Sequence, residues 1–398
     1  MNNLPEDIKT KVYGTVLSKM NFSDEMTEEE VLKLIDDVIT AFPERKMLTI
    51  DEILALRKEV YNSIKKFDVI QEYLDDEAVT EIMINGTNAI FIEKSGSIIK
   101  TDKRFSSEEK LEDVIQQIVG ACNRTVNEAY PIADARLTTG ERVNIVLSPV
   151  SLSGSTVTIR RFPKAPITME KLIEFGSITE EAAFFLRRLV EAKYNIFISG
   201  GTGTGKTTFL NALSRYIPSD ERIITIEDSA ELQLSEAKNL VRLETRTKKA
   251  EGCMPIDIRD LIKAALRMRP DRIIVGEVRG AEAVDMLQAM NTGHDGSLST
   301  GHANSSADMI SRLETMVLSG MDIPLYAIRG QIASGIDIMI HLTRLRDKRR
   351  VVGEISEVIG MKDGEVVFNP LYRFEDNTLK AVGRLKDTRK LEASEYGL

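Results

Sequence analysis

The chain has 398 residues, a length that accommodates two or three domains. It is 42% hydrophobic and 29% charged, which is typical of a globular protein with a substantial core. Its formal net charge of −9 disfavours direct nucleic-acid binding, because neutralising phosphates requires a basic surface. The sequence contains neither a signal-peptide pattern nor a run of about 18 apolar residues that would span a membrane. We therefore expect a cytoplasmic protein that reaches a membrane only through partners.

Residues 1–67 are predicted to form three amphipathic helices. Thr27 and Glu30 have the spacing of a capping box before the second helix, and Thr49 opens the third. None of the side chains in this segment suggests chemistry. We interpret it as a helical docking module, the alternative being an extension that only stabilises the chain.

Residues 68–162 are predicted to form an α+β domain. Its strands are expected at residues 79–85, 89–92, 97–100, 142–147 and 155–162. The spacing of Ser106 and Glu109 predicts a capped helix between these strands, and Cys122 continues its apolar face as a core thiol. Since the two cysteines and three histidines do not have the spacing of zinc ligands, we expect no structural metal.

Residues 163–345 alternate apolar strands with helical stretches, and residues 346–398 contain further short strands. The alternation predicts an α/β domain with a parallel-rich sheet covered on both faces. Its first clear strand covers residues 194–199, and a helical pattern begins at Lys206. Between the two lies a G-x-x-x-x-G-K-T motif.

This glycine-rich segment has the residue types of a phosphate cradle. Glycines let successive backbone N–H groups turn toward phosphate oxygens at the positive end of a helix. Lys206 adds a cation for the β- and γ-phosphates, and Thr207 offers a hydroxyl to Mg²⁺. We expect the segment to bind ATP with Mg²⁺, the alternative being a chance glycine-rich turn. Its residues are Gly200, Gly201, Thr202, Gly203, Thr204, Gly205, Lys206, Thr207 and Thr208.

Two carboxylates follow predicted strands of the same sheet. Glu227 ends the strand at 223–226, and Glu277 ends the strand at 272–276. Because strand ends at the carboxyl edge of a parallel sheet point toward the ligand crevice, we expect both side chains near Mg²⁺ and the attacking water. Each carboxylate taken alone would equally fit a solvated acid. The sequence leaves open which of the two activates the water.

A histidine follows the next predicted strand. A short strand at 297–300 would deliver His302 to the γ-phosphate, where an imidazole can sense or stabilise the charge. A single histidine is more often a structural residue. The presence of His294 nearby, also beside glycines, favours a functional site.

Arginines are frequent in the same part of the chain and in the preceding domain. A guanidinium supplied by another domain or subunit can stabilise the charge that develops in phosphoryl transfer. We favour Arg160 and Arg246 for this role, although most arginines are ordinary surface charges. The others considered are Arg136, Arg142, Arg161, Arg242, Arg267, Arg269 and Arg279.

A basic run covers residues 344–350. Apolar segments at 338–342 and 351–355 flank it, so we interpret it as a hairpin tip whose charges are solvated. Binding of a membrane or of nucleic acid by this run is the alternative.

Four ordered segments resemble the Walker A, Asp box, Walker B and His box of the type II/type IV secretion ATPase superfamily. They lie at residues 200–208, 226–232, 269–280 and 300–304. Three more segments, at 78–86, 134–137 and 355–361, resemble in particular the CpaF-type ATPases of tight-adherence pili. The tetracysteine insertion of many type II secretion ATPases is absent, which favours the CpaF or conjugation-type branches.

The resemblance implies a RecA-like P-loop ATPase domain, preceded by the α+β domain and the helical module, in a homo-hexameric ring. It implies ATP bound between the α+β and RecA-like domains, and hydrolysis that moves an inner-membrane platform protein and pilin subunits. It carries the phosphate and Mg²⁺ roles to Lys206 and Thr207. The two box glutamates are then Glu227 and Glu277, and the His-box histidine is His302.

Three functions are compatible with these features. The first, which we favour, is a cytoplasmic Mg²⁺-ATPase at the inner face of the cell membrane that powers assembly of a type IV-like pilus. The second is a nucleotide-gated scaffold with negligible hydrolysis. The third is a conjugation-type translocation motor. The negative net charge argues against direct binding of DNA by such a motor. The sequence leaves open the substrate, the direction of work and the symmetry of the ring.

Overall fold

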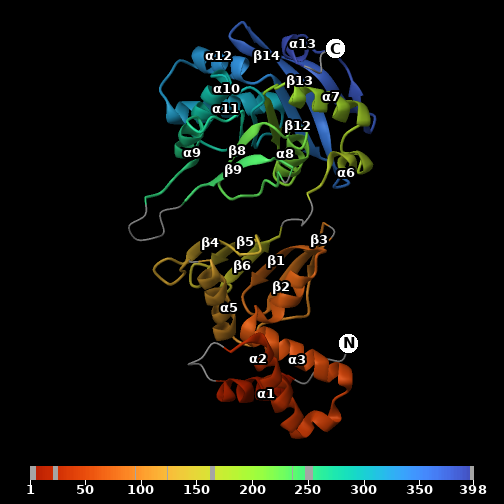
Figure 1. Ribbon diagram of the computed structural model, residues 1–398, viewed down its shortest axis with the longest axis vertical. Helices are drawn as coiled ribbons and strands as arrows, with labels where there is room; N and C mark the ends of the chain where they lie inside the picture. Colours follow the sequence, from red (N-terminus) through yellow and green to blue (C-terminus); the bar gives the residue numbers. More distant parts are fainter. Residues whose placement is uncertain are drawn as a thin grey trace. The chain divides into compact units, whose positions relative to one another are not determined.

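The computed structural model describes residues 6–20, 26–94, 96–122, 124–161, 166–234, 236–246 and 254–394. Its internal contacts divide the chain into two compact units, residues 1–163 and 164–398. Figure 1 colours the first unit red to yellow and the second green to blue. Each unit buries its own hydrophobic clusters, and the two are described separately.

Within the described part of residues 6–65, three α-helices pack together. They are α1 (Glu6–Lys19), α2 (Glu28–Ala41) and α3 (Ile50–Lys65), with the 3-10 turn η1 (Pro43–Met47) between the last two. Capping boxes begin α2 and α3, in which Thr27 and Thr49 exchange hydrogen bonds with Glu30 and Glu52. The apolar faces meet in a small core of valine, isoleucine and leucine side chains. The predicted helices are confirmed.

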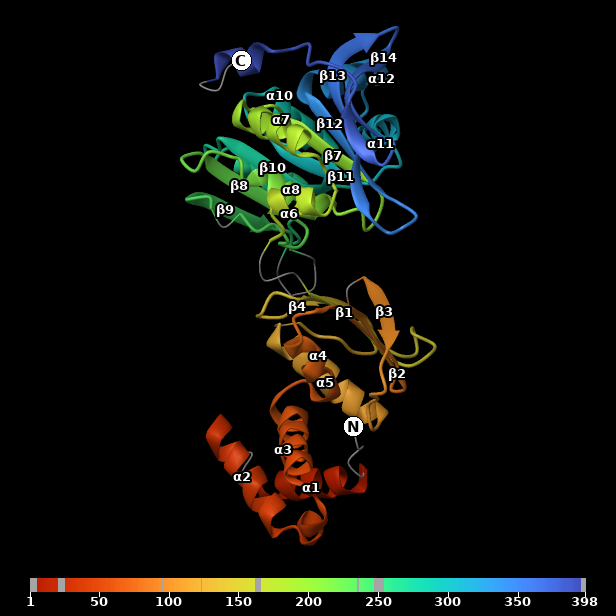
Figure 2. The same cartoon turned by 90° about the vertical axis from the view of Figure 1, so that its right-hand side faces the viewer.

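The rest of the first unit is an antiparallel sheet covered by a helix, as Figure 2 shows. Among the described residues the sheet has six strands in the order β3-β2-β1-β6-β5-β4. Helix α5 (Glu108–Ala121) packs Leu111, Ile115 and Ile118 against it. This is the predicted α+β arrangement. The other elements are η2 (Asp68–Ile70), α4 (Gln71–Asp75), β1 (Val79–Asn85), β2 (Ala89–Lys94), β3 (Ser97–Lys100), β4 (Ile132–Arg136), β5 (Arg142–Val146) and β6 (Thr156–Arg160).

The start of α5 differs from its sequence prediction by one residue. The predicted cap was Ser106, but the side chain of Ser107 accepts the backbone N–H of Lys110. Residue 110 is a lysine, so no carboxylate at this position accepts a hydrogen bond from the backbone N–H of Ser107. The helix therefore has an N-cap but not a full capping box. Beyond the helix, Cys122 is partly buried and its Sγ donates to the carbonyl oxygen of Arg136, whereas Cys253 lies outside the described residues.

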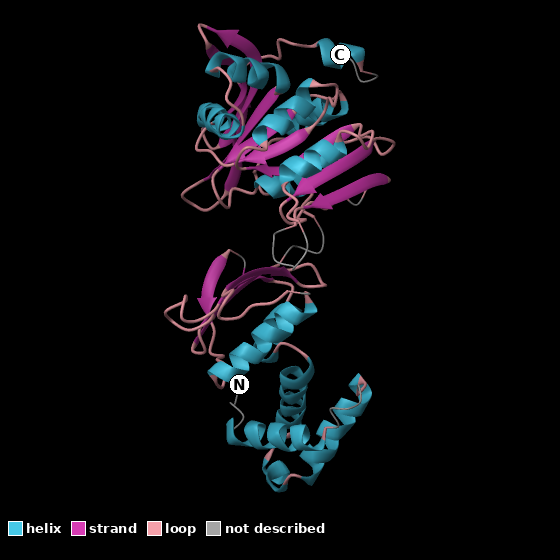
Figure 3. Ribbon diagram, turned by 90° about the vertical axis from the view of Figure 1, so that its left-hand side faces the viewer, coloured by secondary structure: helices cyan, strands magenta, loops and turns pink. Residues whose placement is uncertain are grey.

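A nine-stranded sheet organises the described residues of the second unit (Figure 3). The strand order is β15-β14-β13-β12-β7-β11-β10-β8-β9. All pairs from β12 to β9 are parallel, and β13, β14 and β15 continue the sheet antiparallel. The strands are β7 (Ile196–Gly200), β8 (Arg222–Glu227), β9 (Asn239–Glu244), β10 (Arg272–Val278), β11 (Leu298–Gly301), β12 (Ile338–Arg344), β13 (Arg350–Lys362), β14 (Glu365–Glu375) and β15 (Thr378–Ala381).

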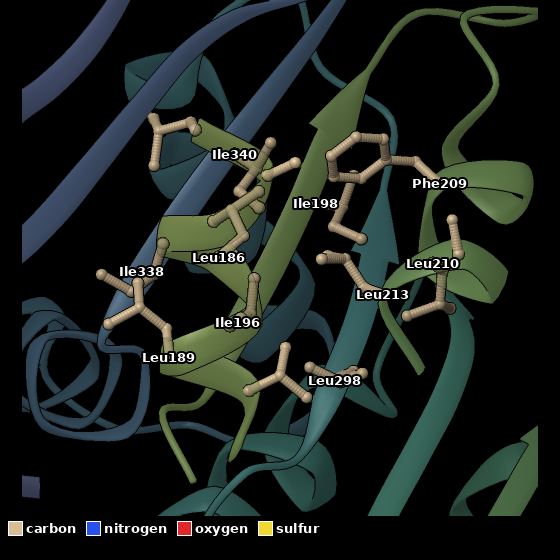
Figure 4. Packing of buried hydrophobic residues seen from close by; sticks show 14 of the residues in the cluster. Leu186, Leu189, Ile196, Ile198, Phe209, Leu210, Leu213, Leu298, Ile338 and Ile340 are labelled. Carbon is tan, nitrogen blue, oxygen red and sulfur yellow. The ribbon is translucent and has the colours of Figure 1, made fainter. Parts of the chain in front are cut away.

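Helices cover both faces of this sheet. On one face, Leu186 of α7 and Leu213 of α8 pack against Ile196 and Ile198 of β7 (Figure 4). The intervening Phe197 packs into the cluster on the other face, because successive side chains of a strand alternate. The predicted parallel-rich α/β fold is confirmed. The helices are α6 (Met169–Glu174), α7 (Glu180–Glu191), α8 (Lys206–Ser214), α9 (Ile258–Ala265), α10 (Ala283–Asn291), α11 (Ser306–Gly320), α12 (Leu325–Gly335) and α13 (Arg389–Ala393).

Residues 346–398, predicted as a separate extension, supply β13 to β15 of the same sheet. The segment after β15 is tied to the start of β7, since the Tyr194 hydroxyl donates to the carbonyl oxygen of Asp387 at 2.7 Å. Lys390 Nζ also lies 2.7 Å from a carboxylate oxygen of Asp295 and of Asp337. The four-part division of the chain stays a prediction.

A buried ion pair fixes the amino-terminal edge of the sheet. Arg272, fully buried at the start of β10, donates from Nε and Nη2 to the two carboxylate oxygens of Glu221 at 2.6 and 3.0 Å. Its Nη1 donates to the carbonyl oxygen of Val190 at 2.7 Å. A Cβ on Gly296 would lie 2.6 Å from that nitrogen, so only glycine fits there.

In the part of the chain described here, no helix combines the length and apolar character needed to cross a bilayer.

Candidate active site

The parallel strands bring the predicted site residues to one edge of the sheet. Strand β7 ends at Gly200, β8 at Glu227 and β11 at Gly301, and Glu277 is the next-to-last residue of β10. The registers Ile226 to Val275 and Gly301 to Ser199 align these ends. Since parallel strands share their carboxyl edge, this edge is where a ligand crevice is expected.

The glycine-rich segment needs its glycines. Gly203 and Gly205 have φ values of +72° and +92°, in the left-handed region that side chains disfavour. A Cβ on Gly200 would lie 2.7 Å from the carbonyl oxygen of Leu342. The Thr204 hydroxyl donates to the carbonyl oxygen of Gly201 at 2.9 Å and tightens the turn. The loop therefore follows a course that few other sequences could adopt.

Helix α8 begins at the end of this loop, with Lys206 as its first residue. Gly205 is its N-cap and contributes no capping side chain. The N–H groups of the first helical turn lack intrahelical partners, and the helix dipole gives this end a partial positive charge. Thr207 and Thr208 follow in this turn and are partly buried. The arrangement suits an anion such as phosphate.

Lys206 is only 8% exposed and lies within the loop. Its Nζ donates to the carbonyl oxygens of Gly200 and Gly201 and contacts Nδ1 of His302, each at 3.1 Å. Burial lowers the pKa of Lys206, Glu277 opposes this shift, and Arg279 adds to it. Phosphate oxygens are stronger acceptors than these carbonyls, because they are charged.

His302 connects the lysine to Glu277. Its Nε2 lies 2.7 Å from Oε1 of Glu277, although the two atoms are not aligned as a hydrogen bond. Burial is the main cause that lowers the pKa of His302, and the positive charge of Lys206 adds to it, while Glu277 opposes both. If the His302 ring is neutral and its Nδ1 accepts a hydrogen bond from Lys206, its proton is on Nε2. This proton then lies on the side of the Glu277 carboxylate.

Arg279 holds the other side of Glu277. Its Nη2 donates to Oε2 of Glu277 at 2.6 Å, and its Nη1 lies 3.8 Å from Asp228. The site therefore contains a continuous chain of charged and polar groups from Lys206 through His302 and Glu277 to Arg279. Arg279 directly follows β10, two positions after Glu277, and this short spacing is the signal in the sequence that could have selected it from the many arginines.

Glu227 is buried, with 4% of its surface exposed. Its Oε1 accepts the backbone N–H groups of Glu231 and Leu232 at 2.8 and 2.9 Å. Among the described residues, its Oε2 has no hydrogen-bond partner. Burial raises the pKa of Glu227 to about 7, against the lowering effect of the two N–H groups. A Cβ on Gly276 would lie 3.0 Å from Cγ of Glu227. The absence of a side chain at Gly276 therefore leaves room for the side chain of Glu227.

These residues fit a bound Mg²⁺ ion. The ion prefers hard oxygen ligands and keeps several waters beside nucleotide phosphates. A buried carboxylate oxygen without a partner is a group that a ligand or its water must satisfy. Glu227 supplies such an oxygen, and Thr207 supplies a hydroxyl in the first turn of α8.

The two favoured arginines have contacts within their own units. Arg160 belongs to the first unit, where its Nε donates to Glu81 at 3.1 Å and the side chain is 65% exposed. Arg246 donates from Nε and Nη2 to the carbonyl oxygen of Met254. Their role in hydrolysis stays a prediction.

The three histidines occupy different places. His294 precedes β11 and contacts the carbonyl oxygen of Ala289 at 3.3 Å, whereas His302 follows the same strand. The two therefore lie at opposite ends of β11, and their nearness in sequence does not make a pair. His341, which sequence reasoning did not select, lies on β12 beside the loop strand, with Nδ1 2.9 Å from the Ser199 hydroxyl. A polar residue between the apolar residues Ile340 and Leu342 was its signal.

The central parallel sheet, the glycine-rich loop before α8 and the carboxylates at the neighbouring strand ends define a P-loop ATPase with a RecA-like fold. The sequence model of the family described as "Type II/IV secretion system protein" matches residues 63–378. The chain belongs to this family.

Relatives of known sequence agree with this assignment, and a solved structure shares the fold. The chain is 34% identical over 293 residues to the conjugal transfer protein TrbB of Rhizobium radiobacter, covering 73% of this chain and 87% of the relative. It is 30% identical over 325 residues to the type IV secretion system protein VirB11 of Bartonella henselae, covering 72% and 91%. The structure resembles that of the ATPase DotB of Legionella pneumophila, with a TM-score of 0.53 at 22% identity over 74% of this chain and 80% of that one. The last similarity concerns the fold.

Proposed function

We propose that the protein hydrolyses ATP with Mg²⁺ in the cradle at residues 200–208 and that hydrolysis powers assembly of a type IV-like pilus of the tight-adherence, CpaF type. It acts as a homo-hexamer in the cytoplasm, at the inner face of the membrane, against a membrane platform protein. The main support for hydrolysis is the connected group of Lys206, His302 and Glu277 at the carboxyl edge of the sheet.

The loop and Lys206 bind the phosphates in this proposal. Lys206 exchanges its carbonyl acceptors for charged phosphate oxygens, while the N–H groups of the first turn of α8 face the same anion. Thr207 and Glu227 would hold Mg²⁺, which would supply positive charge to neutralise the transferred phosphoryl group. Burial of Lys206 and Glu227 keeps these interactions in a low-dielectric environment, where they are stronger than in water.

Glu277 orients the attacking water. Arg279 fixes one of its carboxylate oxygens, and His302 lies against the other, so the carboxylate has a defined direction. His302 senses the terminal phosphate through its contact with Lys206. Arg160 and Arg246 stabilise the transition-state charge across a domain or subunit boundary.

Two variants test the hydrolysis mechanism. Lys206→Ala should lose both nucleotide affinity and turnover, because it removes the buried cation of the cradle. Glu277→Gln should keep nucleotide affinity and slow phosphate release by about 10²–10⁴-fold, the contribution typical of a positioned general base. Phosphate release and binding of a fluorescent ATP analogue measure the two effects, with the exposed Lys171→Ala as control. Normal turnover of Glu277→Gln would contradict the mechanism.

A second candidate is a conjugation motor, favoured by the 34% identity to a conjugal transfer protein. Salt-dependent binding of duplex or single-stranded DNA by the purified protein would support it, against the expectation from the net charge of −9. Absence of phosphate release, with and without the membrane partner, would instead favour the nucleotide-gated scaffold.

A measurement of the mass of the assembly tests whether the protein forms a hexameric ring. Native mass measurement should show a hexamer in the presence of a non-hydrolysable ATP analogue. A monomer both with and without the analogue contradicts the ring.

A further inference from the structure

The hairpin formed by β12 and β13 ends beside the glycine-rich loop. β12 runs parallel to β7, with Leu342 opposite Gly200. Leu342 packs into the cluster that contains α8, so residue 344, two positions on, points to the same face of the sheet. Arg344 and Arg350 are directly opposite one another at the end of the hairpin pairing. The two arginines therefore lie on the side from which the loop enters α8.

Contacts with the loop confirm this placement. A Cβ on Gly203 would lie 3.9 Å from Nη1 of Arg344, and a Cβ on Gly205 would lie 3.7 Å from Cδ of Arg350. A side chain at either glycine would therefore meet an arginine at van der Waals distance, and both glycines have left-handed backbone conformations. The guanidinium of Arg344 and the stem of Arg350 thus lie close to the loop that precedes Lys206.

The charges of this pair are not balanced by the chain. Within the described residues, the side chains of Arg344 and Arg350 have no hydrogen-bond or ion-pair partner, whereas the side chain of the adjacent Arg349 pairs with Asp347 and Asn377. Like charges directly opposite one another on paired strands are destabilising. Lys206 adds a third positive charge in the same loop. An anion that binds at the loop would remove this repulsion.

We propose that Arg344 and Arg350 bind the phosphates of the nucleotide, as two cationic ligands that the same chain supplies from the β12–β13 hairpin. A guanidinium presents several N–H donors in one plane and suits phosphate oxygens. The proposal rests on nucleotide binding at the cradle and adds to it. The predicted hairpin is confirmed, and Arg344 and Arg350 are both exposed at its end, as expected of a solvated tip.

Alanine variants of the two arginines test this assignment in the full-length protein. Arg344→Ala and Arg350→Ala should each weaken binding of a fluorescent ATP analogue by roughly tenfold, as expected for a lost hydrogen bond to a charged group. Arg344→Lys should recover part of the affinity. Arg346→Ala is the matched control, because Arg346 is an exposed arginine of the same hairpin that no loop glycine contacts.

Thermal unfolding supplies the second readout. Without nucleotide, Arg350→Ala should unfold at the same temperature as wild type or slightly above it, because it relieves the repulsion. With nucleotide, its rise in unfolding temperature should be smaller than that of wild type.

The outcomes are distinct. If wild type itself fails to bind the analogue, nucleotide binding at the cradle is wrong. If wild type binds and the two variants bind as tightly as Arg346→Ala, or if all three weaken equally, the assignment of Arg344 and Arg350 is overturned. Unchanged affinity with loss of the oligomer would instead place the pair at a subunit contact and also overturns it.

Discussion

Glu227 and Glu277 occupy corresponding places at the ends of neighbouring strands, but their surroundings differ. Glu277 is engaged by Arg279 and faces His302, so both of its oxygens lie beside groups that carry protons. Glu227 is anchored through one oxygen only and is buried deeply enough to raise its pKa to about 7. The two carboxyl groups are therefore not interchangeable.

The raised pKa of Glu227 predicts how stability depends on pH. The native protein holds this proton more tightly than the unfolded chain, in which a glutamate has its ordinary value of 4.5. Wild type therefore loses stability as pH rises from about 4.5 to about 7, and the loss is complete above that range. Glu227→Gln has no such titration and keeps an oxygen for the two N–H groups. Its stability advantage should grow to a few kcal/mol at about pH 8.

Thermal unfolding of the nucleotide-free protein at about pH 5 and pH 8 measures this difference. Glu174→Gln, on an exposed helical position, is the control and should give the same small offset at both pH values. If the unfolding temperatures of wild type and Glu227→Gln differ by the same amount at both pH values, the carboxyl group is not buried as described.

At the scale of elements, the Arg272–Glu221 pair joins β10 to the segment before β8 and to the end of α7. Both side chains are buried, and Glu221 is the carboxylate that neutralises Arg272. Glu221→Ala should reduce the free energy of unfolding by ~3–5 kcal/mol, because it leaves a buried charge unpaired. Lys193→Ala removes an exposed partner of the same carboxylate, 3.7 Å away, and should cost less than ~1 kcal/mol. Denaturant unfolding distinguishes the two.

Elements with strong local signals were predictable. Capping boxes at Thr27 and Thr49 located α2 and α3, and the change of period at Lys206 located α8. Strand β9 was missed, because its burial is partial and its sequence mixes charged with apolar residues. Strand β4 was missed for a similar reason, since two of its five residues are charged.

The site was predictable where a residue lies at the end of a strand, as Glu227 and Glu277 do, or directly after one, as His302 does. It was not predictable where the neighbour comes from another part of the chain. The position of Arg344 beside Gly203 depends on β12 pairing with β7, which no local pattern indicates. The left-handed backbone of Gly203 and Gly205, by contrast, agrees with the motif itself.

At the scale of the whole molecule, the two units bury separate cores, and the residues that we propose as phosphate ligands lie in the second. A fragment of residues 164–398 should therefore fold and bind a fluorescent ATP analogue within about threefold of the full chain. Its phosphate release should fall by about 10³-fold or more, because Arg160 of the first unit is absent. Binding and turnover measurements on the fragment check both statements. Full turnover by the fragment would remove Arg160 from the mechanism.

The strand order has a consequence for biosynthesis. Both neighbours of β7, namely β11 and β12, are encoded far downstream of it, whereas the sheet of the first unit draws its strands from residues 79–160 alone. During translation the sheet of the first unit can form early. The glycine-rich loop leaves the ribosome after β7, at a time when neither neighbour of that strand has been synthesised. The catalytic half of this protein must therefore fold after most of its codons have been read, and nascent chains stalled within α11 would lack a finished nucleotide pocket.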